Sequence, residues 1–460
     1  MRFDLAIIGG GPGGYLAAIK AAQKGKNVCL IDKDKLGGVC LNWGCIPTKA
    51  LIKNAEVYNY VKNSEKYGIS IKDYSVDFKK NIKRSRNVSD RLSKGIEYLI
   101  KKNKVTHIKG KGILKSENKI LVESEKSIIL EADYIILAMG ARPKSFPGLE
   151  FDYKRIISSK EAMVLDSVPK KIIIIGSGAI GCEFSYYFNE FGSEVHLIEA
   201  KTNILPVEDV EVSKELEREF KKSGIFVYKN SNVIKTESLK TKVKVHLSEK
   251  DKVRILEADY ALLAIGVTGN IENSGIENVG IITRDGSIKV NKYNQTNVPN
   301  VYAIGDVSGP PWLAHVASAQ GVVSVEHAFG DNAETLDYNN IPGCTYTQPQ
   351  VGSIGLTERL ALSKGFKIKV GKYSFRSNGK AMAVGHNDGF IKLIFDEKYG
   401  ELLGAHIIGS EATELIGQLS MAKALESTWE DLAFGVFAHP TFSEAIMEAA
   451  LDAYDIGIHQ

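Results

Sequence analysis

Two cysteines with the spacing of a redox-active pair, Cys40 and Cys45, follow a glycine-rich segment near the start of the chain. In a regular helix, positions five residues apart differ by about 7.5 Å in rise alone, which exceeds the usual separation of the Cα atoms of a disulfide. The chain must therefore bend between the two cysteines, and Gly44 allows such a bend. Pro47 suits the first position of a helix, whose N-terminus would favour a thiolate at Cys45. The pattern predicts a redox disulfide rather than a static disulfide or two buried thiols.

The bulk composition is typical of a large protein without nucleic-acid or membrane partners. At 460 residues the chain is long enough for about three domains. Its 59 Lys and Arg residues and 55 Asp and Glu residues leave a formal net charge of +4, and these charges are dispersed, which disfavours nucleic acid as a partner. Apolar runs are much shorter than the ~20 residues that span a bilayer, and the sequence opens with a strand pattern rather than a leader. We therefore expect a cytoplasmic protein.

The remaining cysteines and the histidines form no further motif. The chain has 5 cysteines, an odd number that does not fit a secreted disulfide framework. Cys29, Cys182 and Cys344 are predicted to be packing residues. The 9 histidines show no metal-ligand spacing with cysteines or acids, so we expect no metal site.

The first of two GxGxxG motifs comprises Gly9, Gly11 and Gly14, which lie between an expected strand at 3–8 and an alanine-rich helix. In this context the glycines allow a tight turn and the close approach of a pyrophosphate to the helix N-terminus. The next expected strand ends at Asp32, 18 residues after Gly14, where an acid can accept hydrogen bonds from a ribose. This motif predicts a bound dinucleotide.

The second motif repeats the arrangement with Gly176, Gly178 and Gly181 after an expected strand at 171–175. Its acid, Glu199, again lies 18 residues after the third glycine. A single GxGxxG pattern is a weak signal, but two copies with the same spacing predict two dinucleotides on one chain. A 2′-phosphate would require arginine where Glu199 stands, whereas a free 2′-hydroxyl requires an acid. The second dinucleotide is therefore expected to be NAD rather than NADP.

Short apolar strands that end in glycine outline the domain organisation. Such strands end at Gly140, Gly266 and Gly305, and we expect Gly140 and Gly266 to contribute to the dinucleotide sites. The layout is one dinucleotide-binding domain interrupted by another. The expected divisions are residues 1–145 and 269–338 for the first domain, 146–268 for the inserted domain, and 339–460 for an α+β domain without a glycine-rich phosphate loop. The predicted fold class is α/β, with two Rossmann-like domains followed by this α+β domain.

Three segments together resemble the pyridine nucleotide–disulfide oxidoreductases over essentially the whole chain: residues 40–49, Gly305-Asp306, and residues 438–444. The resemblance is strongest to members that oxidise dihydrolipoamide. It implies FAD in the first domain, NAD in the inserted domain, and a C-terminal dimerisation domain that forms a homodimer. It also implies that protein-bound dihydrolipoamide is oxidised to lipoamide while NAD⁺ is reduced, in a 2-oxo acid dehydrogenase complex or in glycine cleavage. The implied partners are lipoyl domains and the dihydrolipoyl acyltransferase of such a complex.

The same resemblance implies roles for individual residues. Cys40 is similar to the thiol that forms a mixed disulfide with substrate, and Cys45 to the thiol that contacts the flavin. Lys49 and Glu183 resemble an ion pair near flavin N5, and Asp306 resembles an acid that binds the ribityl chain. Backbone contacts to FAD are implied for Gly112 and Ala314.

His439 and Glu444 form a candidate base near the C-terminus. The proline after His439 keeps the histidine backbone out of a helix, and an acid five residues later can hold the imidazole in one tautomer and stabilise its charged form. The reference pKa of histidine, ~6.5, suits removal of a proton from a dithiol near neutral pH. We expect this pair to act on the thiols of the second chain in the homodimer.

Three positions depart from the common pattern of the family. Trp43 occupies a position that often holds a small aliphatic residue, the segment 267–270 differs from the usual Arg-x-Pro-Asn, and Phe437 replaces a frequent histidine. None of these departures removes a catalytic group.

Three alternative functions share part of this pattern. A glutathione reductase would share the cysteine pair and the flavin, but it usually needs arginines for NADPH where this chain has Gly181 and Glu199. A mercuric reductase would have a cysteine pair near the C-terminus, and no cysteine follows Cys344. A non-catalytic flavoprotein within a larger assembly would not need the complete set of thiols, base and acid.

Overall fold

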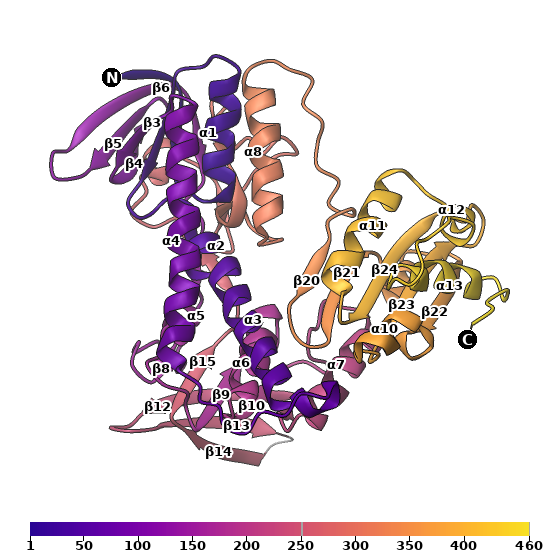
Figure 1. Ribbon diagram of the computed structural model, residues 1–460. Helices are drawn as coiled ribbons and strands as arrows, with labels where there is room; N and C mark the ends of the chain where they lie inside the picture. Colours follow the sequence, from indigo (N-terminus) through magenta and orange to yellow (C-terminus); the bar gives the residue numbers. More distant parts are fainter. Residues whose placement is uncertain (250–251, 460) are drawn as a thin grey trace.

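A 7-stranded sheet in the first domain is built from segments that are far apart in the sequence (Figure 1). The structure is a computed structural model that describes residues 1–249 and 252–459. The sheet follows the order β3 (Thr106–Lys109), β2 (Val28–Asp32), β1 (Arg2–Ile8), β6 (Ile128–Leu137), β5 (Lys119–Glu123) and β4 (Lys111–Ser116), and β19 (Val301–Ala303) pairs with β6. Because β19 follows the inserted domain in the sequence, the sheet of the first domain is complete only after the chain has formed the inserted domain and returned to pair with β6.

Alternate residues of β1 point into two different cores, as the two-residue repeat of a strand requires. Leu5 and Ile7 pack with residues of helices α1 (Pro12–Gln23), α4 (Phe78–Lys102) and α8 (Ala314–Ala328). Ala6 and Ile8 pack on the other face, in a core that includes residues of β4, β5 and the short elements η2 (Ile276–Val279) and β18 (Ser287–Ile288). The exposed strand β17 (Thr283–Arg284) pairs with β18. Burial on both faces explains the nearly continuous apolar sequence of this strand.

Helices α2 (Gly38–Trp43) and α3 (Cys45–Lys62) lie against the long helix α4, with η1 (Ser64–Tyr67) following α3. Serines on the buried face of α4 let the helices approach closely and hold the chain around the cysteine pair. Ser93 Oγ donates to the Leu36 carbonyl at 2.7 Å, and Ser85 Oγ donates to the Pro47 carbonyl at 3.0 Å. The sheet and α4 therefore fix the segment that carries both thiols.

The inserted domain is entered and left through two strands that pair with each other, β7 (Ala141–Pro143) and β16 (Val267–Gly269). Its parallel sheet has the order β11 (Phe226–Tyr228), β10 (Glu194–Ile198), β9 (Lys171–Ile175), β15 (Tyr260–Leu263) and β8 (Ile156–Ile157). The helices are α5 (Ser159–Ala162), α6 (Ala179–Glu190) and α7 (Val210–Lys222). An antiparallel sheet of β12 (Ser231–Ser238), β13 (Val243–Glu249) and β14 (Lys252–Ala258) packs on the parallel one through a shared apolar core.

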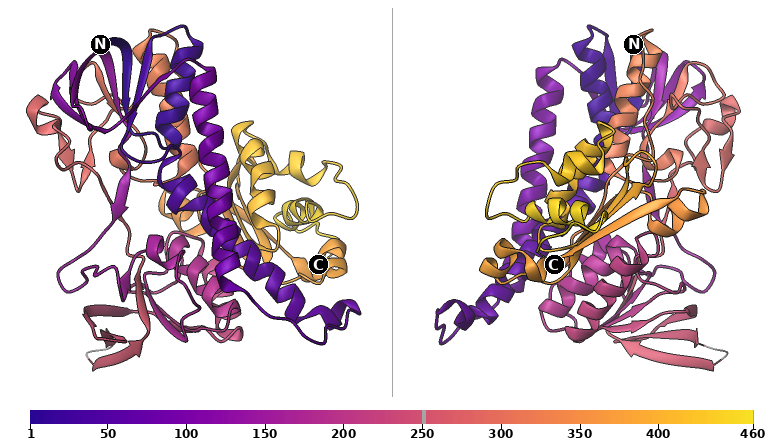
Figure 2. Two further views of the ribbon diagram at one scale, coloured as in Figure 1. Left: turned by 60° about the vertical axis from the view of Figure 1, so that its left-hand side comes forward. Right: turned by 90° about the vertical axis from the view of Figure 1, so that its right-hand side faces the viewer.

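The C-terminal domain is an antiparallel sheet with helices packed on it, seen at the right of Figure 1 and from two further sides in Figure 2. The sheet order is β20 (Gly343–Thr345), β21 (Gln350–Gly355), β24 (Leu402–Gly409), β23 (Phe390–Asp396) and β22 (Ile368–Ser374). The remaining elements are α9 (Glu358–Ser363), η4 (Phe375–Ser377), α10 (Gly379–Val384), α11 (Ala412–Ala424), α12 (Trp429–Ala433) and α13 (Glu444–Asp452). Residues of α11, α12 and α13 share one core with the sheet.

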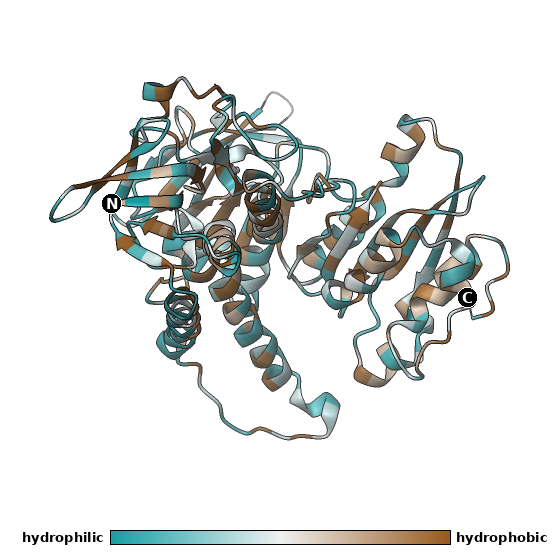
Figure 3. Ribbon diagram, turned by 90° about the horizontal axis from the view of Figure 1, so that it is seen from above, coloured by the Kyte–Doolittle hydropathy of each residue, from teal (hydrophilic) through white to brown (hydrophobic). Residues whose placement is uncertain are grey.

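This architecture confirms the predicted fold class of two Rossmann-like domains followed by an α+β domain. Figure 3 shows hydrophobic residues gathered on the inner strands and helices, with hydrophilic residues on the outer loops. Within the described residues, no helix is both long enough and apolar enough to cross a membrane.

Candidate active site

The predicted bend between the two cysteines lies at Gly44, where α2 has ended and α3 has not yet begun. A Cβ atom at this position would lie 3.1 Å from the Val39 carbonyl oxygen, so the tight connection favours glycine. Because α3 begins at Cys45, Pro47 occupies its third position. The prediction that Pro47 is the first residue of the helix was wrong, since the break at Gly44 sets the boundary two residues earlier. Cys45 thus stands at the helix N-terminus itself.

The two thiols are hydrogen-bonded to each other and differ in acidity. Both are free in the structure, and the redox disulfide stays a prediction. The hydrogen bond with Cys40, the charge of Lys49 and the backbone N–H of Cys45 lower the pKa of Cys45 to about 7, although burial and Glu183 oppose them. The same hydrogen bond and burial raise the pKa of Cys40. Cys45 therefore ionises near neutral pH, while Cys40 keeps its proton.

The predicted ion pair of Lys49 and Glu183 is present and joins all three domains. Lys49 Nζ lies 2.8 Å from Oε1 and 2.9 Å from Oε2 of Glu183, whose side chain is only 4% exposed. The backbone N–H of Tyr346 donates to the same Oε1 at 3.0 Å, and the Tyr346 ring lies 4.4 Å from Lys49 Nζ. Tyr346 belongs to no sequence motif, and we did not predict its place here. The ion pair holds a positive charge one helical turn from Cys45.

The two predicted glycine-rich loops have the same backbone construction. Gly9 and Gly176 have φ angles of +110° and +98°, and a Cβ atom on either would overlap the carbonyl oxygen at the end of a neighbouring strand. A Cβ atom on Gly14 or Gly181 would overlap the carbonyl oxygen of the first glycine in its own loop. Only glycine fits these four positions. The loops are therefore repeats in structure as well as in sequence.

The middle glycines leave open space at the start of the next helix. Gly11 and Gly178 are the residues before α1 and α6, and a Cβ atom on either would have no described atom closer than 3.9 Å. Each helix thus presents its unpaired N–H groups to an open cradle, which is the arrangement that binds a pyrophosphate.

Asp32 and Glu199 hold their own glycine loops in equivalent ways. Asp32 Oδ2 accepts from the backbone N–H of Gly10, and Glu199 Oε2 accepts from the N–H of Ser177 at 3.0 Å. In both loops donor and acceptor are 22 residues apart. Burial raises the pKa of Asp32. These acids shape the loops, a role that the sequence did not reveal, and their contact with a ribose stays a prediction.

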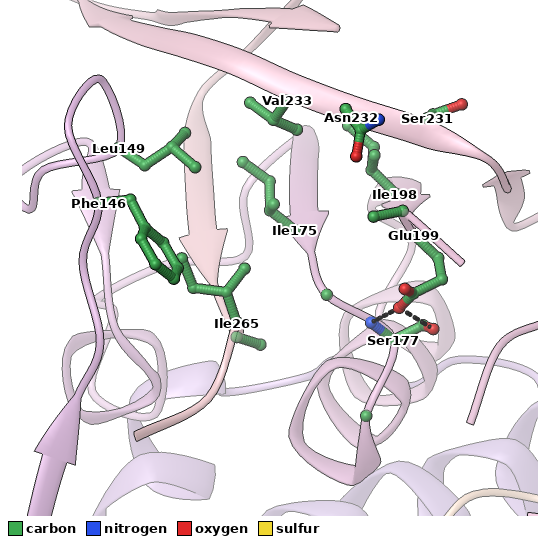
Figure 4. A pocket seen from close by; sticks show the side chains of 14 residues that line it. Phe146, Leu149, Ile175, Ser177, Ile198, Glu199, Ser231, Asn232, Val233 and Ile265 are labelled. Carbon is green, nitrogen blue, oxygen red and sulfur yellow. Dashed lines mark hydrogen bonds between the residues drawn. The ribbon is translucent and has the colours of Figure 1, made fainter. Parts of the chain in front are cut away.

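A pocket of about 390 Å³ opens beside the second loop (Figure 4). Glu199 and Ser177 form its polar side, joined by a hydrogen bond of 2.6 Å from Ser177 Oγ. Apolar side chains, among them Phe146, Leu149 and Ile265, form the opposite side. An acid facing an apolar wall suits the ribose and the flat base of a nucleotide.

Three other predicted cofactor residues or their neighbours lie after the carboxyl ends of parallel strands. Gly140 follows β6 and Gly305 follows β19, next to the loop after β1, and Gly266 follows β15, next to the loop after β9. Ligands of open α/β sheets bind at such edges. Asp306 lies in η3 (Gly305–Ser308), and burial raises the pKa of its carboxyl. Gly112 lies in β4, and Ala314 is the first residue of α8.

His439 and Glu444 are bonded to each other but lie apart from the thiols of the same chain. His439 Nδ1 lies 2.8 Å from Glu444 Oε1, and the His439 side chain is 77% exposed. Burial would raise the pKa of Glu444, but hydrogen bonds from the Thr441 N–H and from His439 lower it. Glu444 begins α13, which Figure 1 and the left view of Figure 2 place across the C-terminal domain from α2. One chain therefore does not bring the predicted base to the predicted thiols.

Comparison with known proteins settles the family. Residues 3–321 match the family model described as pyridine nucleotide-disulphide oxidoreductase, and residues 341–450 match the dimerisation domain of the same family. The chain belongs to the pyridine nucleotide-disulphide oxidoreductases. FAD and NAD are the cofactors of this oxidoreductase, and the two open glycine cradles fit two such dinucleotides.

This oxidoreductase is similar over its whole length to proteins named dihydrolipoyl dehydrogenase. It is 45% identical to the one from Zymomonas mobilis over 462 residues, which cover 100% of this chain and 99% of the relative. It is 43% identical to the one from Rhizobium etli over 471 residues, with 98% of each chain covered. Among solved structures, LpdA from Mycobacterium tuberculosis matches with a TM-score of 0.91 and 26% identity, covering 98% of this chain and 99% of LpdA. The flavoprotein disulfide reductase RclA from Escherichia coli matches with a TM-score of 0.88 and 25% identity, at the same coverage.

Proposed function

We propose that this oxidoreductase is a dihydrolipoyl (dihydrolipoamide) dehydrogenase that serves a 2-oxo acid dehydrogenase complex or glycine cleavage. It oxidises dihydrolipoamide on a lipoyl domain to lipoamide and reduces NAD⁺ to NADH. The observation that carries the proposal is the position of the two thiols on either side of the bend at Gly44, with Cys45 at the N-terminus of α3 and one helical turn from the Lys49–Glu183 ion pair. The charges around the pair agree with this, because they lower the pKa of Cys45 to about 7, whereas the pKa of Cys40 is raised. The full-length likeness to dihydrolipoyl dehydrogenases supports the same reaction. Lipoyl domains and the dihydrolipoyl acyltransferase are the proposed partners, and the cytoplasm is the proposed location.

The unequal thiols assign different roles to the two cysteines. In the oxidised pair, a substrate thiolate attacks the sulfur of Cys40, and the disulfide breaks with its electron pair on Cys45. Cys45 is the better leaving group because Lys49 and the N-terminus of α3 stabilise its thiolate. The second substrate thiolate then attacks the substrate sulfur of the mixed disulfide and displaces Cys40. Lipoamide leaves as a disulfide, and the protein keeps both electrons as a dithiol.

His439 is the proposed base for the protons of the substrate dithiol. Because Glu444 accepts from Nδ1, the neutral ring has Nε2 free to take a proton. The exposure of His439 and its distance from α2 in one chain support a site completed by a second copy. We therefore propose a homodimer in which the thiols come from one chain and the base from the other.

The cofactors would lie on either side of the Lys49–Glu183 ion pair. In the first domain, FAD would be held by Gly9, Gly11, Gly14, Asp32, Gly112, Gly140, Asp306 and Ala314. In the inserted domain, NAD would be held by Gly176, Gly178, Gly181, Glu199 and Gly266. When bound, the flavin supplies two-electron chemistry between the dithiol and the nicotinamide. The negative charge of Glu199 disfavours a 2′-phosphate in its pocket, which supports NAD rather than NADP.

Initial rates with two substrate pairs test the proposed function. The FAD-loaded protein should reduce NAD⁺ with dihydrolipoamide much faster than it oxidises NADPH with glutathione disulfide. Faster turnover of glutathione disulfide would instead assign the chain to the glutathione reductase-like alternative. Absence of both activities in a protein that retains FAD would favour a non-catalytic component.

A further inference from the structure

Trp43, the last residue of α2, lies against two cations from different domains. The guanidinium carbon of Arg86 on α4 and Nζ of Lys160 on α5 each lie 4.7 Å from the centre of the ring system. Both distances are within the range of a cation–π interaction, ~6 Å. Although Trp43 belongs to the first domain, it also packs against an apolar cluster that all three domains share and to which the inserted domain contributes most residues. The Trp43 ring therefore connects the segment between Cys40 and Cys45 with the inserted domain, which is the proposed NAD-binding domain.

Arg86 ties this contact to the chain between the two cysteines. Its Nη1 donates to the Asn42 carbonyl at 2.7 Å, and its Nη2 donates to Ser89 Oγ at 3.0 Å. Its Nε is buried with no hydrogen-bond partner among the described residues, and burial lowers the pKa of the guanidinium. A desolvated guanidinium interacts more strongly with an aromatic face than an exposed one does. The Trp43 ring thus compensates part of the cost of burying Arg86.

Lys160 is the contribution of the inserted domain to this cluster. Its backbone is fixed at the start of α5, where its N–H donates to Ser158 Oγ at 3.2 Å within a capping box. Its side chain is exposed and forms no ion pair among the described residues. An exposed lysine usually extends into water, whereas this one lies over Trp43. The cation is therefore held on the ring rather than by a carboxylate.

We propose that Trp43 is a positioning residue, held by Arg86 and Lys160, that maintains the bend at Gly44 and so couples the placement of the inserted domain to the reactivity of Cys40 and Cys45. This inference rests on the proposed function of the two cysteines as a redox pair. No contact of Trp43 with either sulfur is needed, because the ring acts through the backbone at positions 42–44.

The thiolate depends on this geometry. Cys45 is stabilised by Cys40 and Lys49 against the opposing charge of Glu183, while Asp306 acts on Cys40. The distances from the two sulfur atoms to these charged groups change if the first turn of α3 moves. A looser bend should therefore lower the fraction of thiolate at neutral pH.

The pH dependence of thiol alkylation tests this coupling without any lipoamide. FAD-loaded protein is reduced with dithiothreitol, freed of it anaerobically, and alkylated with iodoacetamide between about pH 5 and pH 9. Mass spectrometry identifies the modified peptides, and the coupled pair is treated as one titrating unit. Lys160→Met and Trp43→Leu should each lower the alkylation rate at pH 7 by about threefold or more, by raising the apparent pKa of the pair. Trp43→Phe, which keeps an aromatic ring, should retain most of the rate.

Two comparisons separate coupling from a general structural effect. Combining Lys160→Met with Trp43→Leu should lower the alkylation rate no further than Trp43→Leu alone does. The reason is that Trp43→Leu already removes the interaction between Lys160 and the Trp43 ring. The control Lys154→Met removes an exposed lysine of the same domain and should titrate like the wild type.

A Lys160→Met protein that titrates like the wild type and like Lys154→Met would overturn the inference. This variant changes an exposed side chain, so it decides the question even if Trp43→Leu does not fold. The alkylation assay requires no substrate, so its result does not depend on whether the protein oxidises dihydrolipoamide. A protein that does not oxidise dihydrolipoamide but whose titration shifts with Lys160→Met would refute the function and keep the coupling.

Discussion

Lys49 and Glu183 form an ion pair with distances of 2.8 and 2.9 Å, and the two charges act on Cys45 in opposite directions. Lys49 lowers the pKa of Cys45, and Glu183 raises it. Since that pKa is lowered to about 7, the thiolate is present above this pH and is lost as the pH falls through it. Lys49→Met should therefore raise the pKa of Cys45, whereas Glu183→Gln should lower it.

The absorbance of the reduced, FAD-loaded protein at long wavelength, where a thiolate beside a flavin absorbs, measures this titration. Its midpoint should move by at least about half a pH unit in opposite directions in the two variants. Shifts in the same direction would show that the ion pair acts through the fold rather than through charge.

Glu199 is expected to set the choice between NAD⁺ and NADP⁺. Glu199→Gln removes the charge that repels a 2′-phosphate but keeps a side-chain oxygen for Ser177. The ratio of kcat/KM for NAD⁺ to that for NADP⁺ should fall about tenfold or more. Glu194→Gln, at the other end of the same strand, serves as the control and should leave the ratio unchanged. An unaltered ratio in Glu199→Gln would mean that Glu199 holds the loop without reading the ribose.

The glycine loops and the cysteine bend were predictable because each depends on local geometry. The spacing alone places the first and third glycines of each loop where no Cβ atom fits, and an acid at the end of the following strand. The helix start was predicted two residues late, because Pro47 is compatible with several positions in the first turn, whereas the chain breaks at Gly44.

Contacts between distant segments could not be predicted in this way. Tyr346 reaches Glu183, and Lys160 reaches Trp43, only because three domains pack together. No periodicity or motif marks these residues, since their neighbours in space lie more than 100 positions away in the sequence. The separation of His439 from the thiols of its own chain is likewise a property of the domain arrangement.

Equivalent substitutions in the two loops should remove different cofactors. Gly14→Ala places a Cβ atom on the Gly9 carbonyl and should lower the FAD content of the purified protein severalfold. Gly181→Ala makes the same clash in the second loop and should keep FAD while weakening NADH binding at least about tenfold. The control Gly95→Ala, in α4 with no atom near its Cβ position, should leave both unchanged and stabilise the fold by about 0.5–1 kcal/mol. Flavin absorbance and NADH fluorescence titrations measure these effects; loss of FAD in Gly181→Ala would reverse the assignment of the loops.

Mixed dimers test whether one active site draws on two chains. Inactive Cys45→Ser chains and inactive His439→Ala chains, unfolded together and reassembled, give heterodimers with one doubly altered site and one intact site. Dihydrolipoamide oxidation should return to about half of the wild-type rate per heterodimer if the base acts across the interface. Verified heterodimers as inactive as both parents would place His439 in the site of its own chain.

The most direct test of the account is a single anaerobic turnover without NAD⁺. Oxidised, FAD-loaded protein is mixed with one equivalent of dihydrolipoamide, quenched with an alkylating agent and digested for mass spectrometry. We predict that Cys40 and Cys45 are both resistant to alkylation before mixing and both modified afterwards, with one lipoamide formed per chain and no change at Cys29, Cys182 or Cys344. Equal labelling of Cys40 and Cys45 before and after mixing, in protein that still binds FAD, would contradict the claim that these two thiols oxidise the substrate.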